Sequence, residues 1–472
     1  MPDYSKIYID GAWKSSHGTS TIDVVNPMTE RVIAAVPAGT SADVDAAVLA
    51  ARNAFEPWWH TTVPERASLL RSVATKLRER ADEIAQIISA EMGSPISFSN
   101  MVQVGAPIRS FEVSADLVEK FEFTRNAGSF DIVREPIGVV GAITPWNYPL
   151  HQIAAKVAYA MAAGNTVVVK PSIMAPLDAW ILAEIMHEIE APAGLFNLVS
   201  GSGAVIGEAL ASHPDIDMVS FTGSTDVGRR IGATAAQTIK RVAMELGGKS
   251  ANVVLPDADL AELMPSAIRS AMSNSGQTCA ALTRLLVPRN RLAETENLAK
   301  QLAESLTVGD PSDPATILGP LASRQQLDIV RGYIDRAITD GAKLVTGGSA
   351  PIRGFGTGCF IAPTVLSNVT VDMEIHNEET FGPVLALVPY DDEEEAVRIA
   401  NATDFGLAGG VWSTDEDKAR AVAVRMRTGQ VAINGAKFNP EAPFGGYKQS
   451  GIGREFGMQG LEEFLETKSL LF

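Results

Sequence analysis

Short apolar runs rich in β-branched residues alternate along this chain with stretches of helical periodicity. The first such runs are 137–143, 167–169 and 218–221, and a helical stretch at 152–163 lies between the first two. Strands that alternate with helices form parallel sheets covered by helices on both faces. The pattern therefore predicts an α/β fold in which ligands bind beyond the carboxyl ends of the strands.

A second series of strands and helices follows in the later part of the chain. It begins at 251–255 and continues through 344–345, 384–388 and 431–433. A chain of 472 residues is too long for one hydrophobic core, so two or three domains are expected.

The N-terminal region is predicted to supply packing elements and no chemistry. Two short strands flank a turn at Asp10-Gly11. Ser41 is the expected N-cap of a helix over 43–55. One further helix is expected from Pro64 to the stop signal at Gly93.

Charge and cysteine content restrict the classes of partner and compartment. The formal net charge of −17 argues against nucleic acid or an anionic membrane surface as a partner. Two cysteines are too few for a disulfide framework and fit a reducing compartment. The chain starts without an apolar signal core, and it contains no apolar run of about 18 residues. A cytoplasmic location without membrane contact is therefore expected, and no metal site is expected because the six histidines lack ligand spacing.

Cys279 is the candidate nucleophile of the chain. It follows Gly276-Gln277-Thr278 on a stretch that is expected to bend, and Glu245 lies upstream beside a glycine-rich break. A thiolate that attacks a carbonyl forms a covalent intermediate, and a carboxylate can then activate water to release it. A lone cysteine is more often a small buried hydrophobe, and a lone glutamate is usually solvated, so neither residue alone decides the matter.

Two motifs extend this argument to a family. Glu245-Leu246-Gly247-Gly248-Lys249 and Gly276-Gln277-Thr278-Cys279 resemble the signature motifs of the aldehyde dehydrogenase superfamily in residues, order and separation. Further matches run from Pro145 to Lys468, so the resemblance covers essentially the whole chain. It implies an enzyme that oxidises a small-molecule aldehyde to the carboxylic acid with NAD or NADP.

The same resemblance implies a domain plan with a Rossmann-like cofactor domain, a second α/β catalytic domain and a small β oligomerisation hairpin. The expected boundaries are 1–117 and 137–246 for the cofactor domain, 247–449 for the catalytic domain, and 118–136 and 450–472 for the bridging segment. The hairpin within 121–133 would pair with the last strand, about 467–472. An exposed strand edge there invites pairing with another subunit, so a homodimer or homotetramer is expected.

The resemblance assigns catalytic roles to Cys279, Glu245, Asn147, Lys156 and Glu455. The Cys279 thiolate would attack the aldehyde, while Asn147 and the Cys279 N–H would hold the oxyanion. Loss of hydride would leave a thioester, and Glu245 would activate the water that hydrolyses it. Lys156 and Glu455 match the family's proton exit path.

Two alternatives to this reading are kept. CoA-acylating relatives generally lack the glutamate, so Glu245 favours release by water over a CoA-acylating semialdehyde dehydrogenase. A non-catalytic binding protein on the same fold would be expected to have lost Cys279, Glu245 or Asn147, and all three are present.

The cofactor site is expected at the strand ends. Gly223, Ser224 and Gly228 lie on a strand-to-helix turn, where backbone N–H groups can meet a phosphate. The family motifs place these further residues on the cofactor: Thr144, Pro145, Trp146, Lys170, Ser172, Ile173, Leu246, Glu379 and Phe381. NAD-preferring relatives usually carry a glutamate where this chain has Ile173, so NAD is expected with NADP tolerated or even favoured.

The substrate tunnel is expected from alignment to the same motifs. Its lining would comprise Tyr148, Gln152, Ala155, Thr278, Ala280, Phe438 and Phe444. Ala155 is small where relatives often carry an aromatic residue, which predicts a wide tunnel. The sequence leaves open whether His151 or Lys437 contacts substrate, and it does not identify the aldehyde.

Overall fold

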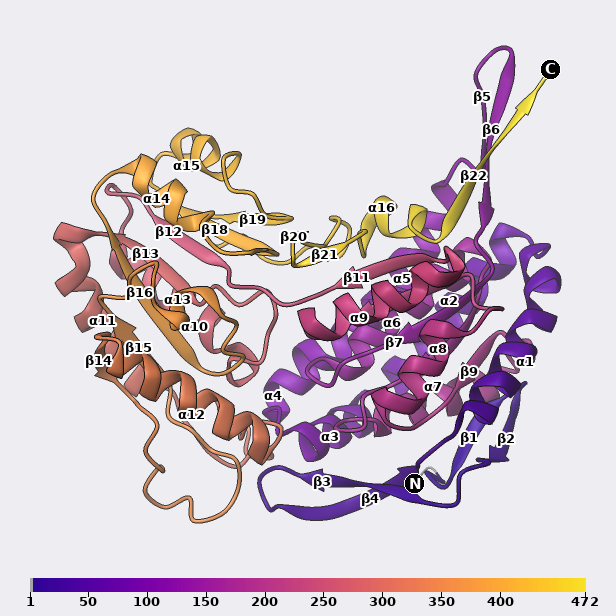
Figure 1. Ribbon diagram of the computed structural model, residues 1–472, viewed down its shortest axis with the longest axis horizontal. Coiled ribbons are helices and arrows are strands. Elements are labelled where there is room, and N and C mark those ends of the chain that lie inside the picture. The colour runs from indigo at the N-terminus through magenta and orange to yellow at the C-terminus, as the bar shows by residue number, and fades with distance from the viewer. Residues whose placement is uncertain (1–2) are drawn as a thin grey trace.

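Two large β-sheets lie in separate halves of the computed structural model, which describes residues 3–472 (Figure 1). Within these residues the first sheet has eight strands in the order β2 (Ala12–Ser15), β1 (Lys6–Ile9), β9 (Phe196–Leu198), β8 (Thr166–Lys170), β7 (Val139–Ile143), β10 (Met218–Thr222), β11 (Arg241–Glu245) and β21 (Gly451–Ile452). Its central strands β9, β8, β7, β10 and β11 run parallel. The predicted α/β class and the Asp10-Gly11 hairpin between β1 and β2 are confirmed.

The second sheet has seven strands among the described residues. Their order is β14 (Lys343–Thr346), β15 (Thr364–Ser367), β16 (Val384–Tyr390), β13 (Arg284–Pro288), β12 (Ala251–Val254), β18 (Ala408–Trp412) and β19 (Gln430–Ile433). All neighbours are parallel except the pair of β14 and β15. The second predicted series of strands is therefore also confirmed.

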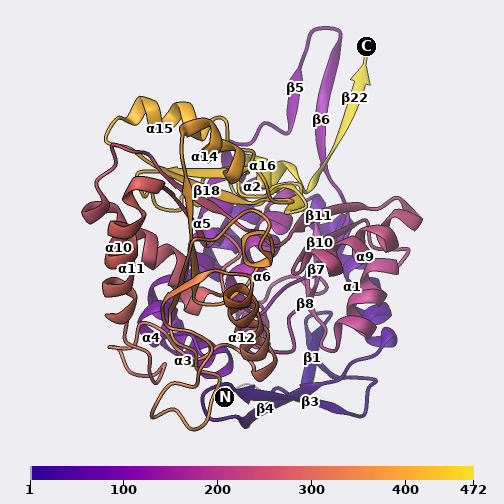
Figure 2. The same cartoon turned by 60° about the vertical axis from the view of Figure 1, so that its left-hand side comes forward.

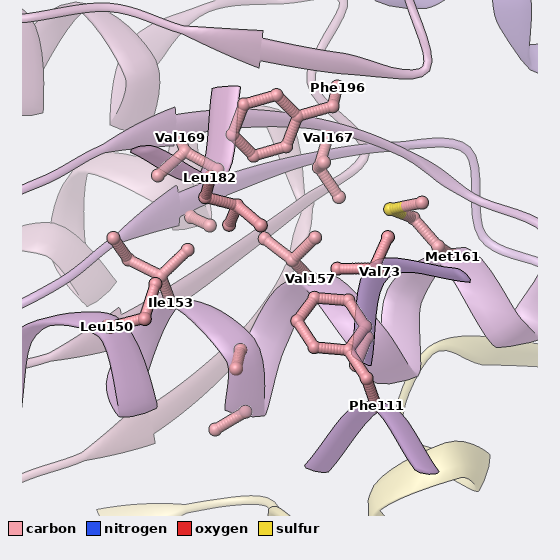
Figure 3. Close-up of a cluster of buried hydrophobic side chains, with 14 of the residues drawn as sticks. Val73, Phe111, Leu150, Ile153, Val157, Met161, Val167, Val169, Leu182 and Phe196 are labelled. Carbon is pink, nitrogen blue, oxygen red and sulfur yellow. The ribbon is translucent and has the colours of Figure 1, made fainter. Parts of the chain in front are cut away.

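Helices cover both faces of the first sheet, which is why its inner strands are apolar without interruption. Val167 and Val169 of β8 face one helical layer, and Val168 faces the other. The first layer contains α2 (Val63–Glu79), α3 (Ala81–Met92), α5 (Gly105–Lys120), α6 (Pro149–Ala163) and α7 (Leu177–Glu188). The opposite layer contains α1 (Ser41–Trp59), α8 (Glu208–Ser212) and α9 (Thr225–Ala235). Figure 3 shows part of the first layer, where Ile153 and Val157 of α6 lie among side chains of β8 and its neighbours.

The second sheet is covered in the same way. One face packs against α10 (Leu260–Met272) and α11 (Leu292–Glu304). The other packs against α12 (Arg324–Thr339), α14 (Glu393–Ala400) and α15 (Glu416–Ala423). The smaller elements are β3 (Thr21–Asn26), β4 (Arg31–Pro37), α4 (Ile96–Phe98), the π-helix η1 (Ser99–Val104), η2 (Gly203–Gly207), η3 (Ala236–Thr238), η4 (Ser273–Gly276), η5 (Arg289–Arg291), α13 (Glu374–Asn377), β17 (Phe405–Gly406), β20 (Tyr447–Lys448) and α16 (Gly457–Glu462). No helix among residues 3–472 combines the length and apolarity needed to cross a lipid bilayer.

Two predicted helix boundaries were wrong. The N-cap of α1 is Thr40 rather than Ser41, because the Thr40 N–H donates to the Asp43 carboxylate at 2.8 Å in a capping box. The single helix expected from Pro64 to Gly93 is two helices, α2 and α3, which meet at Arg80. The Arg80 guanidinium donates to Glu83 and Glu184 and thereby joins the break to α7. Gly93 does end α3, with a left-handed φ of 80°.

A three-stranded sheet projects from the body of the molecule (Figures 1 and 2). It contains β5 (Thr124–Asn126), β6 (Phe130–Pro136) and β22 (Leu465–Leu471) in the order β22-β6-β5. The predicted pairing of this hairpin with the last strand is confirmed over the length of β22. Most of β22 is exposed, and Leu471 keeps 81% of its surface accessible.

Candidate active site

A cleft of about 290 Å³ lies between the two sheets, beyond the carboxyl ends of β7, β10 and β11. The predicted site residues that line it are Pro145, Trp146, Asn147, Gly223, Ser224, Glu245, Leu246, Cys279, Glu379 and Phe381. They come from both halves of the chain, so the cleft joins the predicted cofactor-binding and nucleophile motifs in one place. This is the position at which parallel sheets bind ligands.

Two glycines allow the halves to approach closely. A Cβ on Gly247 would lie 2.5 Å from Glu379 Oε2, and one on Gly248 would lie 2.6 Å from the Cys279 carbonyl oxygen. The Gly248 N–H also donates to Glu379 Oε1 at 3.1 Å. The glycine pair after Leu246 is therefore required by the contact between the two motifs.

Cys279 follows a turn that forces three residues into the left-handed region. Asn274, Ser275 and Gly276 have φ values of 54°, 55° and 73°, and a Cβ on Gly276 would lie 2.0 Å from the Gly382 oxygen. Strained backbone of this kind gathers at functional sites. Burial raises the pKa of the Cys279 thiol to about 12, and the nearby Glu379 and Glu245 carboxylates add to the rise. The thiol is therefore protonated at neutral pH in the free protein and needs a proton acceptor to react.

Glu245 can serve as that acceptor. It is the last residue of β11, is buried, and its Oε2 has no hydrogen-bond partner among residues 3–472. Burial raises its pKa well above the usual range, and the Glu455 charge raises it further, whereas Lys156 opposes the shift. A buried carboxyl whose pKa is raised in this way is a stronger base than an exposed one, which suits a group that accepts a proton.

Asn147 lies on the loop after β7 and is held from several directions. Its side-chain Nδ2 donates to the Gln277 carbonyl at 3.1 Å. Its backbone oxygen accepts from Asn274 Nδ2 at 2.8 Å and from Gln103 Nε2 at 3.0 Å. The amide therefore sits beside the turn that carries Cys279, where it can donate to an oxyanion.

The residues of the predicted proton path, Lys156 and Glu455, lie together behind the cleft. Lys156, with 1% of its surface exposed, donates to Glu455 Oε1 at 2.5 Å and to Thr222 Oγ1 at 2.7 Å. Thr222 lines the cleft. The buried ion pair is thus connected to the same space as Glu245.

The other predicted cofactor residues lie outside the lining of this cleft. Lys170 is buried at the end of β8, its Nζ donates to the Pro171 oxygen at 2.8 Å, and burial lowers its pKa to about 8. Ser172 Oγ accepts from the Met174 N–H at 3.2 Å, Ile173 is half-buried, and Thr144 is buried with an unpartnered Oγ1 among the described residues.

The turn after β10 presents backbone N–H groups of the kind that can hold phosphates. Ser224 is the N-cap of α9 without a side-chain capping bond, so N–H groups of the first turn are left free beside the cleft. A Cβ on Gly228 would lie 2.5 Å from Leu246 Cδ2, so glycine there allows α9 to pack against Leu246.

Glu379 and Phe381 close the cleft from the second half. Burial raises the pKa of Glu379 to about 7. Phe381, in a left-handed conformation with φ of 53°, meets Trp146 edge to face with ring centroids 5.4 Å apart. The cleft is also lined by Gln326, Ile329 and Tyr333 of α12, which were not predicted from the sequence. A helix with scattered polar residues offers no signal that one face borders a ligand site.

Three of the predicted tunnel residues belong to an aromatic wall that consists of Tyr148, His151, Phe438, Phe444 and Phe456. The Tyr148 hydroxyl is 2.7 Å from Thr278 Oγ1. The His151 ring stacks on Phe456 at 5.3 Å, and Phe456 meets Phe438 at 5.6 Å. Phe456, which also contacts Phe444, had not been anticipated from the sequence.

Some of the predicted tunnel residues line a second cavity, and others are buried. Ala280, Phe438 and Phe444 line a second cavity of about 550 Å³, together with Lys437. Gln152 and Ala155 are buried, and Ala155 has only 1% of its surface exposed. His151 Nδ1 has no hydrogen-bond partner in the described part of the chain, and burial lowers the pKa of this imidazole to about 4. Residues 3–472 contain no group of three or more His, Cys, Asp or Glu side chains that could hold a metal ion.

Comparison with known proteins agrees with this geometry. The family model described as "Aldehyde dehydrogenase family" matches residues 13–470. A 3-succinoylsemialdehyde-pyridine dehydrogenase from a Pseudomonas species is 47% identical over 100% of this chain and 99% of its own length. A crystal structure of a cysteine-to-alanine mutant of aldehyde dehydrogenase C from Pseudomonas syringae, with NAD+ and octanal, superposes with a TM-score of 0.99 at 49% identity, covering 100% of this chain and 98% of that one. A Mycobacterium tuberculosis aldehyde dehydrogenase complexed with NAD+ gives a TM-score of 0.97 at 43% identity, covering 99% and 98% of the two chains. With its motifs gathered in one cleft, this chain belongs to the aldehyde dehydrogenase family.

Proposed function

We propose that this cleft oxidises an aldehyde to the carboxylic acid with NAD and releases the acid by hydrolysis. The observation that carries the proposal is the meeting of Cys279, Glu245 and Asn147 in one cleft with the open turn at Ser224. NAD+ complexes of the Pseudomonas syringae and Mycobacterium tuberculosis proteins support the choice of cofactor.

The residues of the cleft divide the reaction into two halves. In the first, Glu245 accepts the thiol proton, the Cys279 sulfur bonds to the aldehyde carbon, and Asn147 with the Cys279 N–H holds the oxyanion. NAD, when bound, supplies the hydride acceptor, so that Cys279 is left carrying a thioester. The proton that Glu245 took from the thiol then leaves through the Lys156–Glu455 pair, which returns Glu245 to its ionised form. In the second half Glu245 removes a proton from water, the hydroxide attacks the thioester, and the cysteine sulfur leaves as the thiolate. The Lys156–Glu455 pair then provides an exit for the proton.

The roles of the outer cofactor residues remain part of this proposal. Lys170, Ser172 and Ile173 would meet the adenosine, Gly223 and Ser224 the pyrophosphate, and Glu379 the nicotinamide ribose. The absence of a carboxylate at Ile173 removes a repulsive charge, so NADP is expected to be accepted as well.

The aromatic wall supports an aldehyde with an apolar body. The Pseudomonas syringae relative was crystallised with octanal, and the 47% identical relative is named for a pyridine-bearing semialdehyde. Phe438 and Phe444, which line the second cavity and pack against the buried Phe456, offer apolar surface that suits either kind of tail. We therefore include medium-chain aliphatic and aryl aldehydes in the proposed substrate class.

The domain plan and assembly follow the same reasoning. β11 ends the parallel part of the first sheet at Glu245 and β12 opens the second at Ala251, which supports a boundary near 246–247. The exposed edge of β22 supports assembly as a homodimer or homotetramer. A cytoplasmic location stays a prediction that rests on the two free cysteines.

The test is reduction of NAD with a panel of aliphatic, aryl and carboxylate-bearing aldehydes, with wild type and Cys279→Ala in parallel. Reduced cofactor that forms with wild type and not with the variant is the expected result. If reduced cofactor forms only when CoA or phosphate is added, the acyl group passes to that acceptor and not to water, and the hydrolytic step is wrong. No signal with any aldehyde under any of these conditions would refute the proposal.

A further inference from the structure

The π-helix η1 inserts a buried amide against the backbone of Asn147. Gln103, whose surface is 0% exposed, donates from Nε2 to the Asn147 carbonyl oxygen at 3.0 Å. Asn274, on the nucleophile turn, donates to the same oxygen at 2.8 Å. The Asn147 peptide is thus held between an N-terminal element and the turn that carries Cys279.

The orientation of the Gln103 amide follows from chemistry. A carbonyl oxygen only accepts, so the NH2 group must face Asn147, and Gln103 Oε1 is then left buried without a partner among the described residues. An unpaired buried carbonyl is unfavourable, and a leucine of similar size would avoid it. π-Helical turns are rare and are frequently found at functional sites. Both features point to a function for Gln103 rather than to packing alone.

The function of Gln103 would be to fix the direction in which the Asn147 side chain points. Its amide has two N–H groups, and one of them donates to the Gln277 oxygen. Only the other is free for an oxyanion. Because a misplacement of about 1 Å can reduce catalysis strongly, the peptide frame that carries this N–H must be fixed relative to Cys279.

We propose that Gln103 is a positioning residue that fixes the Asn147 oxyanion donor in register with Cys279, with Asn274 as the second anchor. This inference rests on the proposed function, because it presumes that Asn147 binds the oxyanion. Gln103 does not touch the reacting atoms and acts through Asn147.

The first test is Gln103→Leu, with Gln86→Leu on the exposed face of α3 as the matched control. One lost hydrogen bond of ordinary strength is expected to lower the rate of the first burst of reduced cofactor about tenfold. The affinity for NAD should not change, and the control should retain wild-type rates. An unchanged burst rate in Gln103→Leu would overturn the proposal.

The second test is Gln103→Glu, which adds a pH readout that a packing role would not produce. A protonated glutamic acid can donate to the Asn147 oxygen, whereas the ionised form would repel it. The variant is therefore expected to approach wild-type rates at low pH and to lose activity as pH rises, with a limb that wild type lacks. If Gln103→Leu does not fold, the pH profile of Gln103→Glu serves as the test of the inference. A Gln103→Glu profile equal to that of wild type would overturn it.

A double-mutant cycle separates this inference from the proposed function. In an Asn147→Ala background, Gln103→Leu should have no further effect, because the group that it positions is gone. An equal loss in both backgrounds would show that Gln103 acts elsewhere. If Asn147→Ala alone leaves the rate unchanged, the oxyanion assignment fails, and the inference fails with it.

Discussion

The free energy of unfolding of this protein is expected to depend on pH because two of its carboxyl groups are buried. Asp178 at the start of α7 and Glu91 near the end of α3 are fully buried, and neither has a cationic partner among residues 3–472. The Leu177 N–H donates to Glu91 at 2.9 Å, and the Leu150 N–H, three residues beyond Asn147, lies near Asp178. Burial raises the pKa of Asp178 to about 8, and the same cause, together with Asp178, raises that of Glu91.

The sign of the effect follows from the direction of the shift. The folded state binds the Asp178 proton more tightly than the unfolded state, so the free energy of unfolding falls as pH rises from the unfolded pKa to the folded one. Each pH unit in this window removes about 1.4 kcal/mol, so about 3 kcal/mol is lost between pH 5 and pH 7.5. With an unfolding entropy of about 2 cal/mol/K per residue, a chain of 472 residues would lose about 3 °C in Tm from this group.

Asp178→Asn tests this reasoning, because asparagine resembles the protonated acid but cannot ionise. Thermal unfolding of wild type and variant is followed by circular dichroism from pH 5 to pH 8. We expect the difference in Tm between the variant and wild type to grow in favour of the variant by about 3 °C from pH 5 to pH 7.5. Asp82→Asn, an exposed acid on α3, is the control and should not change the pH dependence. A variant with the pH dependence of wild type would refute the argument.

Three further predictions concern the proposed cofactor site and the proposed catalytic base. Ile173→Glu should raise the ratio of kcat/KM with NAD to kcat/KM with NADP by about tenfold or more, because a carboxylate accepts from ribose hydroxyls and repels a 2′-phosphate. An unchanged ratio would remove Ile173 from the cofactor site. Glu245→Gln should lower kcat by about 100-fold or more, because both the activation of the Cys279 thiol and the hydrolysis of the thioester lose their base; turnover at the wild-type rate would contradict the role of Glu245 as base. Burial raises the pKa of Glu379 to about 7, and only the ionised form accepts from two ribose hydroxyls. The affinity for NAD, measured by calorimetry, should therefore rise from pH 6 to pH 8 in wild type and not in Glu379→Gln. An equal pH dependence in both proteins would assign the titration to another group.

Local patterns were sufficient for much of the fold. Runs such as 167–169 are apolar without interruption because the strand is buried on both faces, and that requirement is visible in the sequence. The candidate reactive residues Cys279, Glu245 and Asn147 were singled out because their short motifs resemble those of the family, and the structure brings all three to one cleft. The break between α2 and α3 was missed because both sides have good helical periodicity. Contacts of Arg80 with Glu184, 104 positions away in the chain, accompany that break.

The sequence by itself thus determined the α/β class, the order of the two sheets along the chain and the choice of candidate reactive side chains. Only the tertiary structure decided which side chains surround them. Gln103 meets Asn147, and Asn274 meets it from the other half, because packing brings together segments 44 and 127 positions from Asn147. A lone glutamine in a helical stretch carries no mark of such a contact. The pKa values of Cys279 and Glu245 are raised by burial and by neighbouring charges, so these shifts arise only in the folded protein.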